Sequence, residues 1–540
     1  ELAALARTGV EVPVLPDTLR TIIGARLDQL ARDDRNVIDN AATLGTSGTL
    51  DALAAFGERL GQPVISGALE RLEERGLLAT DGGRWRFLSD SVRDAAYATM
   101  SKTSRAQRHA TLAEVLGEAA QPSLDDLAHH TAAAAQLLGE LGSVPGVSPL
   151  IAEDALRLLY NAARRAALRG SFRIAIAQAS RGLELLPQHP SLHTIRADLL
   201  LIRAASNLEL RQFKAAWADV DDVLIAVPAD RDGPRRGEAL RLLGGLHHAM
   251  GAQEAARDAL TESARLLRAS NRADLLARAL RSRGFIELFN GSLVDAETYL
   301  AQADAIYESL GDTSGRAWIE QHRALAAFLR GDLDDAAQRL TVVAATMDRL
   351  GDLNGVGWAQ GMSAFVAFYQ SDFDRADALA CAVAERAAER GDEWAMAMMR
   401  TLRAHVSRWR GNLAEALEGA KAARTAFRRI GDPLGLTQAL SVLVRVQVAL
   451  GQFDDARRSG DEIMSVAETS PLGSIPVIAV AGAAMHRGLA HHALRRVITA
   501  EDAMVVSQIS NDEPALIRVL ATAQLADFDD AARVLAALGP

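Results

Sequence analysis

The stretch "RGDLDDAAQRLTVVAATMDRLGD", residues 330–352, contains a turn signal at each end of a helical pattern. Gly331 and Gly351 permit the left-handed backbone that ends a helix, and the Asp after each glycine can accept hydrogen bonds from the free N–H groups of the next helix. Between the turns, apolar side chains recur at helical spacing, at Ala336, Leu340, Val343 and Met347. The stretch therefore predicts one helix bounded by two turns.

Variants of this stretch recur along the chain, beginning at Arg169, Leu210, Met250, Asn290, Gln370, Arg410 and Leu450. The apolar residue after the turn advances in steps of 40 residues, from Leu293 through Leu333, Phe373 and Leu413 to Phe453. A second mark keeps the same period: Gly-Asp pairs begin at Gly311, Gly351, Gly391 and Gly431. Two turns per unit predict two helices per unit. Helix pairs at such a period are typical of an α-solenoid, in which each unit stacks on its neighbours to bury its apolar face.

One small residue keeps the same period within the repeats, at Ala216, Ala256, Ala296, Ala336, Ala376, Ala416 and Ala456. Small side chains at a helix crossing let two helices approach closely. We therefore expect these alanines at tight crossings, where a bulky residue would separate the stack.

The composition agrees with a mainly all-α fold. Of the 540 residues, 49% are apolar but only 4% are aromatic, and prolines number only 15, which suits many helices packed through small side chains. With a net charge of −10, the chain as a whole lacks the positive charge that is typical of nucleic-acid-binding proteins. The single cysteine, Cys381, excludes an internal disulfide framework and a cysteine-based zinc site. The single cysteine fits a reducing compartment, so we expect a cytoplasmic protein. No apolar run is long enough for a membrane span, so we expect no membrane partner.

Residues 1–150 do not follow the 40-residue period. A helix is expected at residues 65–75, and the short β-type runs "LLAT" and "RWRFL" flank the turn residues "DGG" at 81–83, which is a hairpin signal. Helices followed by a hairpin are the order of a winged-helix domain. We therefore predict a winged helix at residues 33–100, a helical linker at 101–150, and the repeats at 151–540.

Two parts of the sequence resemble known families. The segments "LPDTLRTIIGARLDQL", "WRFLSDSVRDAAYATM" and "RAQRHATLAEVL" are similar to the stretch downstream of the nucleotide-binding core in bacterial, actinobacterial-type, signal-transduction ATPases of the STAND class. The repeats resemble the long-period tetratricopeptide repeats of maltose-regulator-like sensors. The resemblance implies that residues 1–32 are the helical end of an upstream ATPase module, and that the chain is the C-terminal part of a larger regulator. Such regulators include LuxR-type proteins, cyclase–ATPase fusions and the mycobacterial Ser/Thr protein kinase K.

Motifs for catalysis are absent from the sequence. A phosphate-binding loop needs Gly-Lys followed by Ser or Thr, and none of the three lysines, Lys102, Lys214 and Lys421, follows a glycine. No kinase or cyclase catalytic motif is visible either. We therefore expect this chain to be no enzyme and to hold no cofactor. Because nothing after residue 480 resembles a LuxR-type DNA-binding unit, the output domain, a Ser/Thr kinase or nucleotide cyclase, is expected upstream.

Aromatic and methionine residues concentrate between residues 318 and 410. Trp318, Trp358 and Met398 hold the same position in successive units, on the first helix of each pair, which lines the concave groove of a tetratricopeptide superhelix. This stripe could receive a protein, a peptide or a small effector, and the alternative is plain packing between repeats. The candidate contact residues are Trp318, His322, Trp358, Phe365, Tyr369, Trp394, Met398, Arg400 and Arg403.

Two other features could indicate functional sites, but the argument for each is weaker than for the aromatic stripe. The doublets His129-His130, His247-His248 and His491-His492 are poor metal ligands, because adjacent helical residues point about 100° apart. The helix expected at residues 65–75 carries three Glu beside two Arg, an unfavourable face for phosphates. We therefore interpret the winged helix as an intramolecular clamp. The alternative is a transcription regulator whose winged helix binds DNA.

Overall fold

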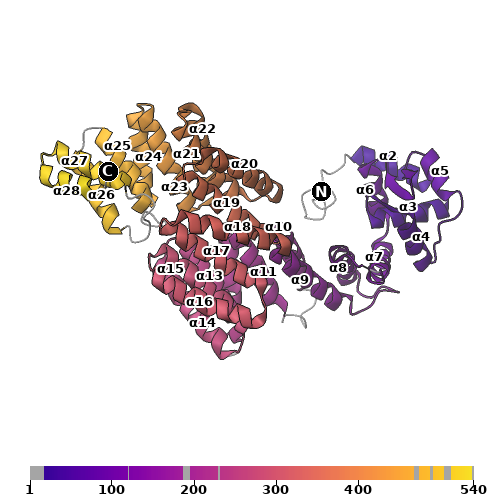
Figure 1. The fold of residues 1–540 in the computed structure, drawn as a ribbon. Helices are drawn as coiled ribbons and strands as arrows, with labels where there is room; N and C mark the ends of the chain where they lie inside the picture. The colour runs from indigo at the N-terminus through magenta and orange to yellow at the C-terminus, as the bar shows by residue number, and fades with distance from the viewer. Residues whose placement is uncertain are drawn as a thin grey trace. The chain divides into compact units, whose positions relative to one another are not determined.

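The computed structural model describes residues 17–119, 121–186, 195–228, 232–466, 474–486, 490–503 and 512–537. Part of the segment predicted to end an ATPase module, residues 1–16, lies outside this range. The chain divides into two compact units, one of Glu1–Ala167 and Arg173–Ile202, the other of Leu168–Phe172 and Arg203–Pro540 (Figure 1). Among the described residues, no helix is both long enough and apolar enough to span a bilayer.

The first unit begins with helices surrounding a small sheet. Its elements are α2 (Asp17–Asp28), α3 (Arg32–Leu44), β1 (Ser47–Thr49), α4 (Leu50–Arg59), α5 (Ala68–Glu74), β2 (Leu78–Asp81), β3 (Arg84–Phe87) and α6 (Asp90–Thr99). The strands are antiparallel in the order β1-β3-β2. The predicted hairpin is confirmed, because Asp81 pairs with Arg84 across the turn and both Gly82 and Gly83 have positive φ. Trp85 of β3 is 1% exposed and anchors the core.

The helix expected at residues 65–75 is shorter in the structure. α5 begins after Gly67, whose φ of 80° is left-handed and therefore outside the helix. Its buried face is Ala68 and Leu72, which pack with Leu78 of β2 in one apolar cluster.

Four helices complete most of the first unit: α7 (Lys102–Gly117), α8 (Leu124–Leu141), α9 (Ile151–Leu168) and α10 (Phe172–Leu185). They share one core in which alanine predominates and in which Leu156 and Leu159 are among the largest buried side chains. Because alanine adds little volume, the helix axes can approach closely. This close approach brings polar side chains of α7, α8 and α10 together at the edge of the core.

The second unit is built from successive helices, and each helix after the first packs on the next. α11 (Arg196–Glu209) leads into α12 (Phe213–Ala226), α13 (Gly233–Ala249), α14 (Gln253–Ala269), α15 (Ala273–Phe289), α16 (Leu293–Leu310), α17 (Thr313–Leu329), α18 (Leu333–Leu350), α19 (Leu353–Tyr369), α20 (Phe373–Arg390), α21 (Glu393–Trp409), α22 (Leu413–Ile430), α23 (Pro433–Ala449), α24 (Phe453–Val466), α25 (Ser474–His486), α26 (Ala490–Ala503), α27 (Asp512–Gln524) and α28 (Phe528–Ala537). The predicted two helices per 40 residues are confirmed from α16 to α23.

The turns of the repeat have the predicted chemistry. Gly311, Gly351, Gly391 and Gly431 end their helices in the left-handed conformation, with φ between 66° and 76°. The Asp that follows caps the next helix: Oδ1 of Asp352, for example, accepts a hydrogen bond from the N–H of Gly355 at 2.9 Å. Each such cap stabilises its helix by about 1 kcal/mol.

The predicted tight crossings are also confirmed. The periodic alanines from Ala216 to Ala456 are at most 1% exposed. Glycines at helix starts are just as crowded, since a Cβ added at Gly435 would lie 2.1 Å from the Phe427 ring. The stack therefore has no spare volume at these positions.

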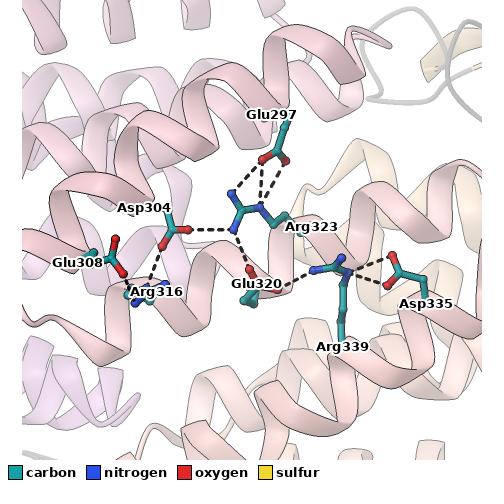
Figure 2. A network of polar contacts seen from close by, with 8 residues as sticks. All are labelled: Glu297, Asp304, Glu308, Arg316, Glu320, Arg323, Asp335 and Arg339. Carbon is teal, nitrogen blue, oxygen red and sulfur yellow. Dashed lines mark hydrogen bonds and ion pairs between the residues drawn. The ribbon is translucent and has the colours of Figure 1, made fainter.

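A polar network crosses α16, α17 and α18 (Figure 2). Arg323 of α17 binds Glu297 and Asp304 of α16, at 2.9 and 3.0 Å, and Glu320 of its own helix at 2.7 Å. Arg339 of α18 binds the same Glu320 at 2.7 Å. Because the partners come from successive helices, the network links them in one register.

Candidate binding pocket in the solenoid

An open-sided pocket lies between α19, α20, α21 and the end of α11, all within the second unit. Its larger part is apolar and aromatic, formed by Trp358, Met362, Phe365, Trp394, Met398 and Met399. The rings of Trp358 and Trp394 lie 5.3 Å apart with planes tilted by 31°, so they form one continuous aromatic wall.

The helical repeat explains this wall. Trp358 on α19 and Met398 on α21 are separated by one 40-residue period, so they hold equivalent positions on successive first helices. Trp394 precedes Met398 by four residues, which places both on the same face of α21. The two indole rings remain partly exposed, whereas Met398 and Met399 are 8% and 3% exposed and form the floor.

Part of the polar edge of the pocket comes from a distant part of the chain. Glu209, the last residue of α11, accepts a hydrogen bond from Asn354 Nδ2 of α19 at 3.3 Å across 145 residues. The guanidinium of Arg211 lies 4.7 Å from the Trp394 ring centroid, a cation–π contact.

Arg211 occupies a strained backbone position. Its φ is 59°, in the left-handed region, where the equivalent turns of later repeats carry glycine, at Gly251, Gly291, Gly331, Gly411 and Gly451. Ser371, with φ 63°, is the other exception. A left-handed non-glycine residue costs about 1 kcal/mol. The side chain of Arg211 therefore lies against the Trp394 ring from a turn position whose backbone conformation favours glycine.

A second guanidinium, that of Arg390, borders the same pocket. Burial lowers the pKa of Arg390, although Asp392 acts in the opposite direction. Asp392 is itself the cap of α21 and accepts from the N–H of Ala395 at 3.0 Å. Within the described part of the chain, neither Arg390 nor Arg211 has a carboxylate within ion-pair distance. The pocket thus combines an aromatic wall with two available hydrogen-bond donors of positive charge.

The structure brings together four of the nine residues proposed from the sequence: Trp358, Phe365, Trp394 and Met398 line this pocket. Trp318 and His322 do not. The indole N–H of Trp318 donates to Asp352 Oδ2 at 3.0 Å, and His322 is buried against the Phe285 ring at 5.0 Å. Both positions have contacts typical of packing between repeats.

The other three proposed residues also lie outside the pocket. Tyr369 packs edge-on against Phe328 and Phe368. Arg403 binds Asp377 of α20 at 2.7 Å, and Arg400 is exposed. The residues that the sequence interpretation missed, Glu209, Arg211, Asn354 and Arg390, form the polar edge. The one signal for them in the sequence was Arg211 in place of a turn glycine.

The histidine doublets hold no metal-ligand arrangement. No group of three or more His, Cys, Asp or Glu side chains suited to a metal ion occurs in the residues that the structure describes. His248 bonds Gln253 Oε1 through Nδ1 at 3.0 Å, and burial lowers its pKa to about 4.

Stacked helix pairs with a 40-residue period, close alanine crossings and glycine–aspartate turns define the second unit as a tetratricopeptide-like α-solenoid. No protein-family model matches the chain, and no curated protein does.

Several solved structures are similar to this chain. One is a signal-transduction ATPase with numerous domains and a tetratricopeptide-repeat sensor from Pyrococcus horikoshii, 12% identical, with a TM-score of 0.36, covering 92% of this chain and 66% of its own. Another is aspartyl phosphate phosphatase F from Bacillus subtilis, 14% identical, with a TM-score of 0.40, covering 68% and 88%. A third is yeast Tom70, 13% identical, with a TM-score of 0.35, covering 79% and 97%. The chain therefore spans just under two thirds of the first of these proteins.

Proposed function

We propose that this chain is a non-catalytic sensor region of a signal-transduction protein, and that its solenoid binds a peptide segment of a partner in the pocket of Trp358 and Trp394. The observation that carries the proposal is the open aromatic wall bordered by two arginines without carboxylate partners in the described structure. Large aromatic rings and arginine are the residues that most often dominate binding energy at protein interfaces.

The chemistry of the pocket favours a peptide over a strongly charged small molecule. Arg211 and Arg390 are balanced by Glu209 and Asp392, so the edge has donors and acceptors but little net charge. The floor is apolar. An apolar or aromatic side chain would fill the floor, and the polar backbone on either side of it would bond to the edge.

The regulatory part of the proposal concerns residues 33–100. We infer that α3, α4, α5 and the hairpin are a winged helix that acts as an intramolecular clamp on an upstream ATPase module, which in turn controls a Ser/Thr kinase or nucleotide cyclase. The sequence resemblance supports this placement. For the effector to act as a signal, it must bind one arrangement of solenoid and clamp more tightly than the other, because only differential affinity shifts a population.

The charges on α5 bear on the alternative, a transcription regulator. Arg71 is bound to Asp34 at 2.6 Å, while Glu70, Glu73 and Glu74 are exposed. Such a face repels phosphates. We expect no change in fluorescence anisotropy when labelled duplex DNA is titrated with the chain at low salt, whereas saturable binding that weakens with added salt would favour DNA recognition.

The peptide proposal is tested by selecting peptides from a displayed random library with the full chain. Selected peptides should share an apolar or aromatic position and should bind Trp394→Ala at least ten-fold more weakly than the unaltered chain. Arg400→Ala, on the same helix but outside the pocket, is the matched control and should bind normally. Selected peptides that bind both variants equally would contradict the proposal.

A further inference from the structure

A second pocket lies in the first unit, separate from the solenoid pocket. It is open-sided and is lined by residues of α6, α7, α8 and α10. Its charged lining consists of Lys102, Arg105, Arg181 and Glu140, with His129 beside them. The pocket lining thus contains three positively charged side chains and one carboxylate.

The single carboxylate is already engaged. Lys102 Nζ and Glu140 Oε2 are 2.7 Å apart, so these two charges neutralise each other. Arg181 Nη1 donates to Nδ1 of His129 at 3.0 Å. In the part of the chain that the structure describes, neither Arg181 nor Arg105 has a carboxylate within ion-pair distance.

Arg105 retains an unused donor. Its guanidinium lies 5.3 Å from the Tyr97 ring centroid, and its Nε is buried without a hydrogen-bond partner. A buried donor without a partner costs about 1–3 kcal/mol, unless a ligand or solvent satisfies it. Arg105 therefore brings to the pocket a positive charge with no carboxylate partner among the described residues, although its Nε is enclosed by protein.

Tyr97 does not supply the missing negative charge. Its hydroxyl is 2.7 Å from His109 Nε2, and His109 Nδ1 is 2.9 Å from His130 Nδ1, so a buried polar chain holds the ring in place. Burial raises the pKa of Tyr97, although Arg105 and Arg93 act to lower it. The phenol is therefore neutral at physiological pH. Burial also lowers the pKa of Arg181, which shows that its charge is poorly hydrated.

We propose that this pocket binds a phosphate dianion, either free or as a small phosphomonoester. Three cations, Lys102, Arg105 and Arg181, less the one charge of Glu140, leave a net charge of +2. A phosphate monoester carries about −1.5 to −2 near neutral pH, which matches this excess better than a single carboxylate does. Two guanidinium groups provide paired N–H donors suited to phosphate oxygens. Ala133 and Leu137 form an apolar side wall that can contact the organic group of an ester.

The test is calorimetric titration of the full chain with inorganic phosphate and, separately, with glycerol phosphate, in sodium chloride of matched ionic strength. We expect saturable binding of at least one of them. Arg105→Gln and Arg181→Gln should each weaken that binding at least ten-fold. Arg164→Gln removes the same charge from an exposed site on α9 and should bind as the unaltered chain does. Tighter binding of the ester would identify an organic phosphate as the ligand, and tighter binding of inorganic phosphate would identify the free ion.

Two results would overturn the proposal: no saturable binding of either anion by the unaltered chain, or equal binding by Arg105→Gln and Arg164→Gln. Circular dichroism establishes that each variant is folded. Should Arg181→Gln not fold, Arg105→Gln decides alone, because the Arg105 side chain is partly exposed and its loss leaves the alanine-rich core intact. Trp394→Ala should leave phosphate binding unchanged, which separates this site from the solenoid pocket.

Discussion

Two neighbouring stretches of the solenoid, α16–α18 and α19–α21, share one backbone plan and differ in what their side chains leave available. In α16–α18 the arginines Arg323 and Arg339 are bound to carboxylates (Figure 2). The Trp318 indole N–H donates to Asp352. In α19–α21 Arg403 is likewise bound to Asp377, and the Trp394 indole N–H donates to Asp432. The tryptophan equivalent to Trp318, Trp358, however, faces an open pocket bordered by Arg211. The repeat therefore supplies a frame, and a few substitutions leave an open pocket on α19–α21 at a position that is packed in α16–α18.

The largest loss of stability is expected from a larger side chain at one of the tight helix crossings that all the repeats share. Ala336→Leu on α18 adds volume at a position that is 0% exposed, and should lower the free energy of unfolding by about 1–3 kcal/mol. Ala345→Leu, an exposed position on the same helix, is the control and should change it little. Urea unfolding followed by circular dichroism measures both. Equal stability of the two variants would show that the α18 crossing is looser than the structure indicates.

Acid should destabilise the α16–α18 stretch, because this stretch contains the buried His322. Burial lowers the pKa of His322 to about 3 from an ordinary 6.5, with Arg281 adding to the effect. The unfolded chain therefore takes up a proton that the folded chain refuses, so stability is present above pH 6.5 and falls as the pH drops toward 3. At pH 5 this one group should cost about 2 kcal/mol.

Urea unfolding at pH 7 and pH 5 checks this expectation. His322→Phe, which keeps an aromatic ring beside Phe285, should lose less stability on acidification, whereas a substitution of the exposed His491 by Gln should behave as the unaltered chain does. An identical acid-induced loss in the unaltered chain and His322→Phe would contradict the assignment.

Arg211 sharpens the comparison because it can be replaced in two ways. Arg211→Gly and Arg211→Ala both remove the guanidinium, but only glycine relieves the left-handed backbone. The glycine variant should therefore be about 1 kcal/mol more stable than the alanine variant. Both should bind the selected peptide more weakly than the unaltered chain. Normal peptide binding by either variant would show that the Arg211 guanidinium does not contribute to peptide binding.

The smallest effect is expected in the polar network of Figure 2. Glu320→Gln removes one carboxylate shared by Arg323 and Arg339, both partly exposed. Such pairs contribute about 0.2–1 kcal/mol each, and salt weakens them. The loss in stability should shrink in 1 M sodium chloride. A loss that is unaffected by salt would indicate a packing defect at Glu320 instead.

The parts of the structure that follow from short-range chemistry were predictable from the sequence. Gly351 and Asp352 end one helix and cap the next, so the helix pairs and their period could be read directly. The apolar part of the pocket could also be predicted from the sequence, because Trp358 and Met398 occupy equivalent positions in successive repeats.

The polar edge was not predictable. The hydrogen bond between Glu209 and Asn354 depends on the accumulated rotation of several repeats, and no local pattern encodes that rotation. The chain from Tyr97 through His109 to His130 likewise forms only when three helices pack together.

The central claim is that equivalent tryptophans have different roles, and one paired measurement tests it. The affinity of the selected peptide is compared for Trp358→Ala and Trp318→Ala, with the urea midpoint of each variant. We expect Trp358→Ala to weaken binding at least ten-fold, and Trp318→Ala to bind normally but unfold at lower urea, since it loses the hydrogen bond to Asp352. Equal affinities for the two variants would contradict the account.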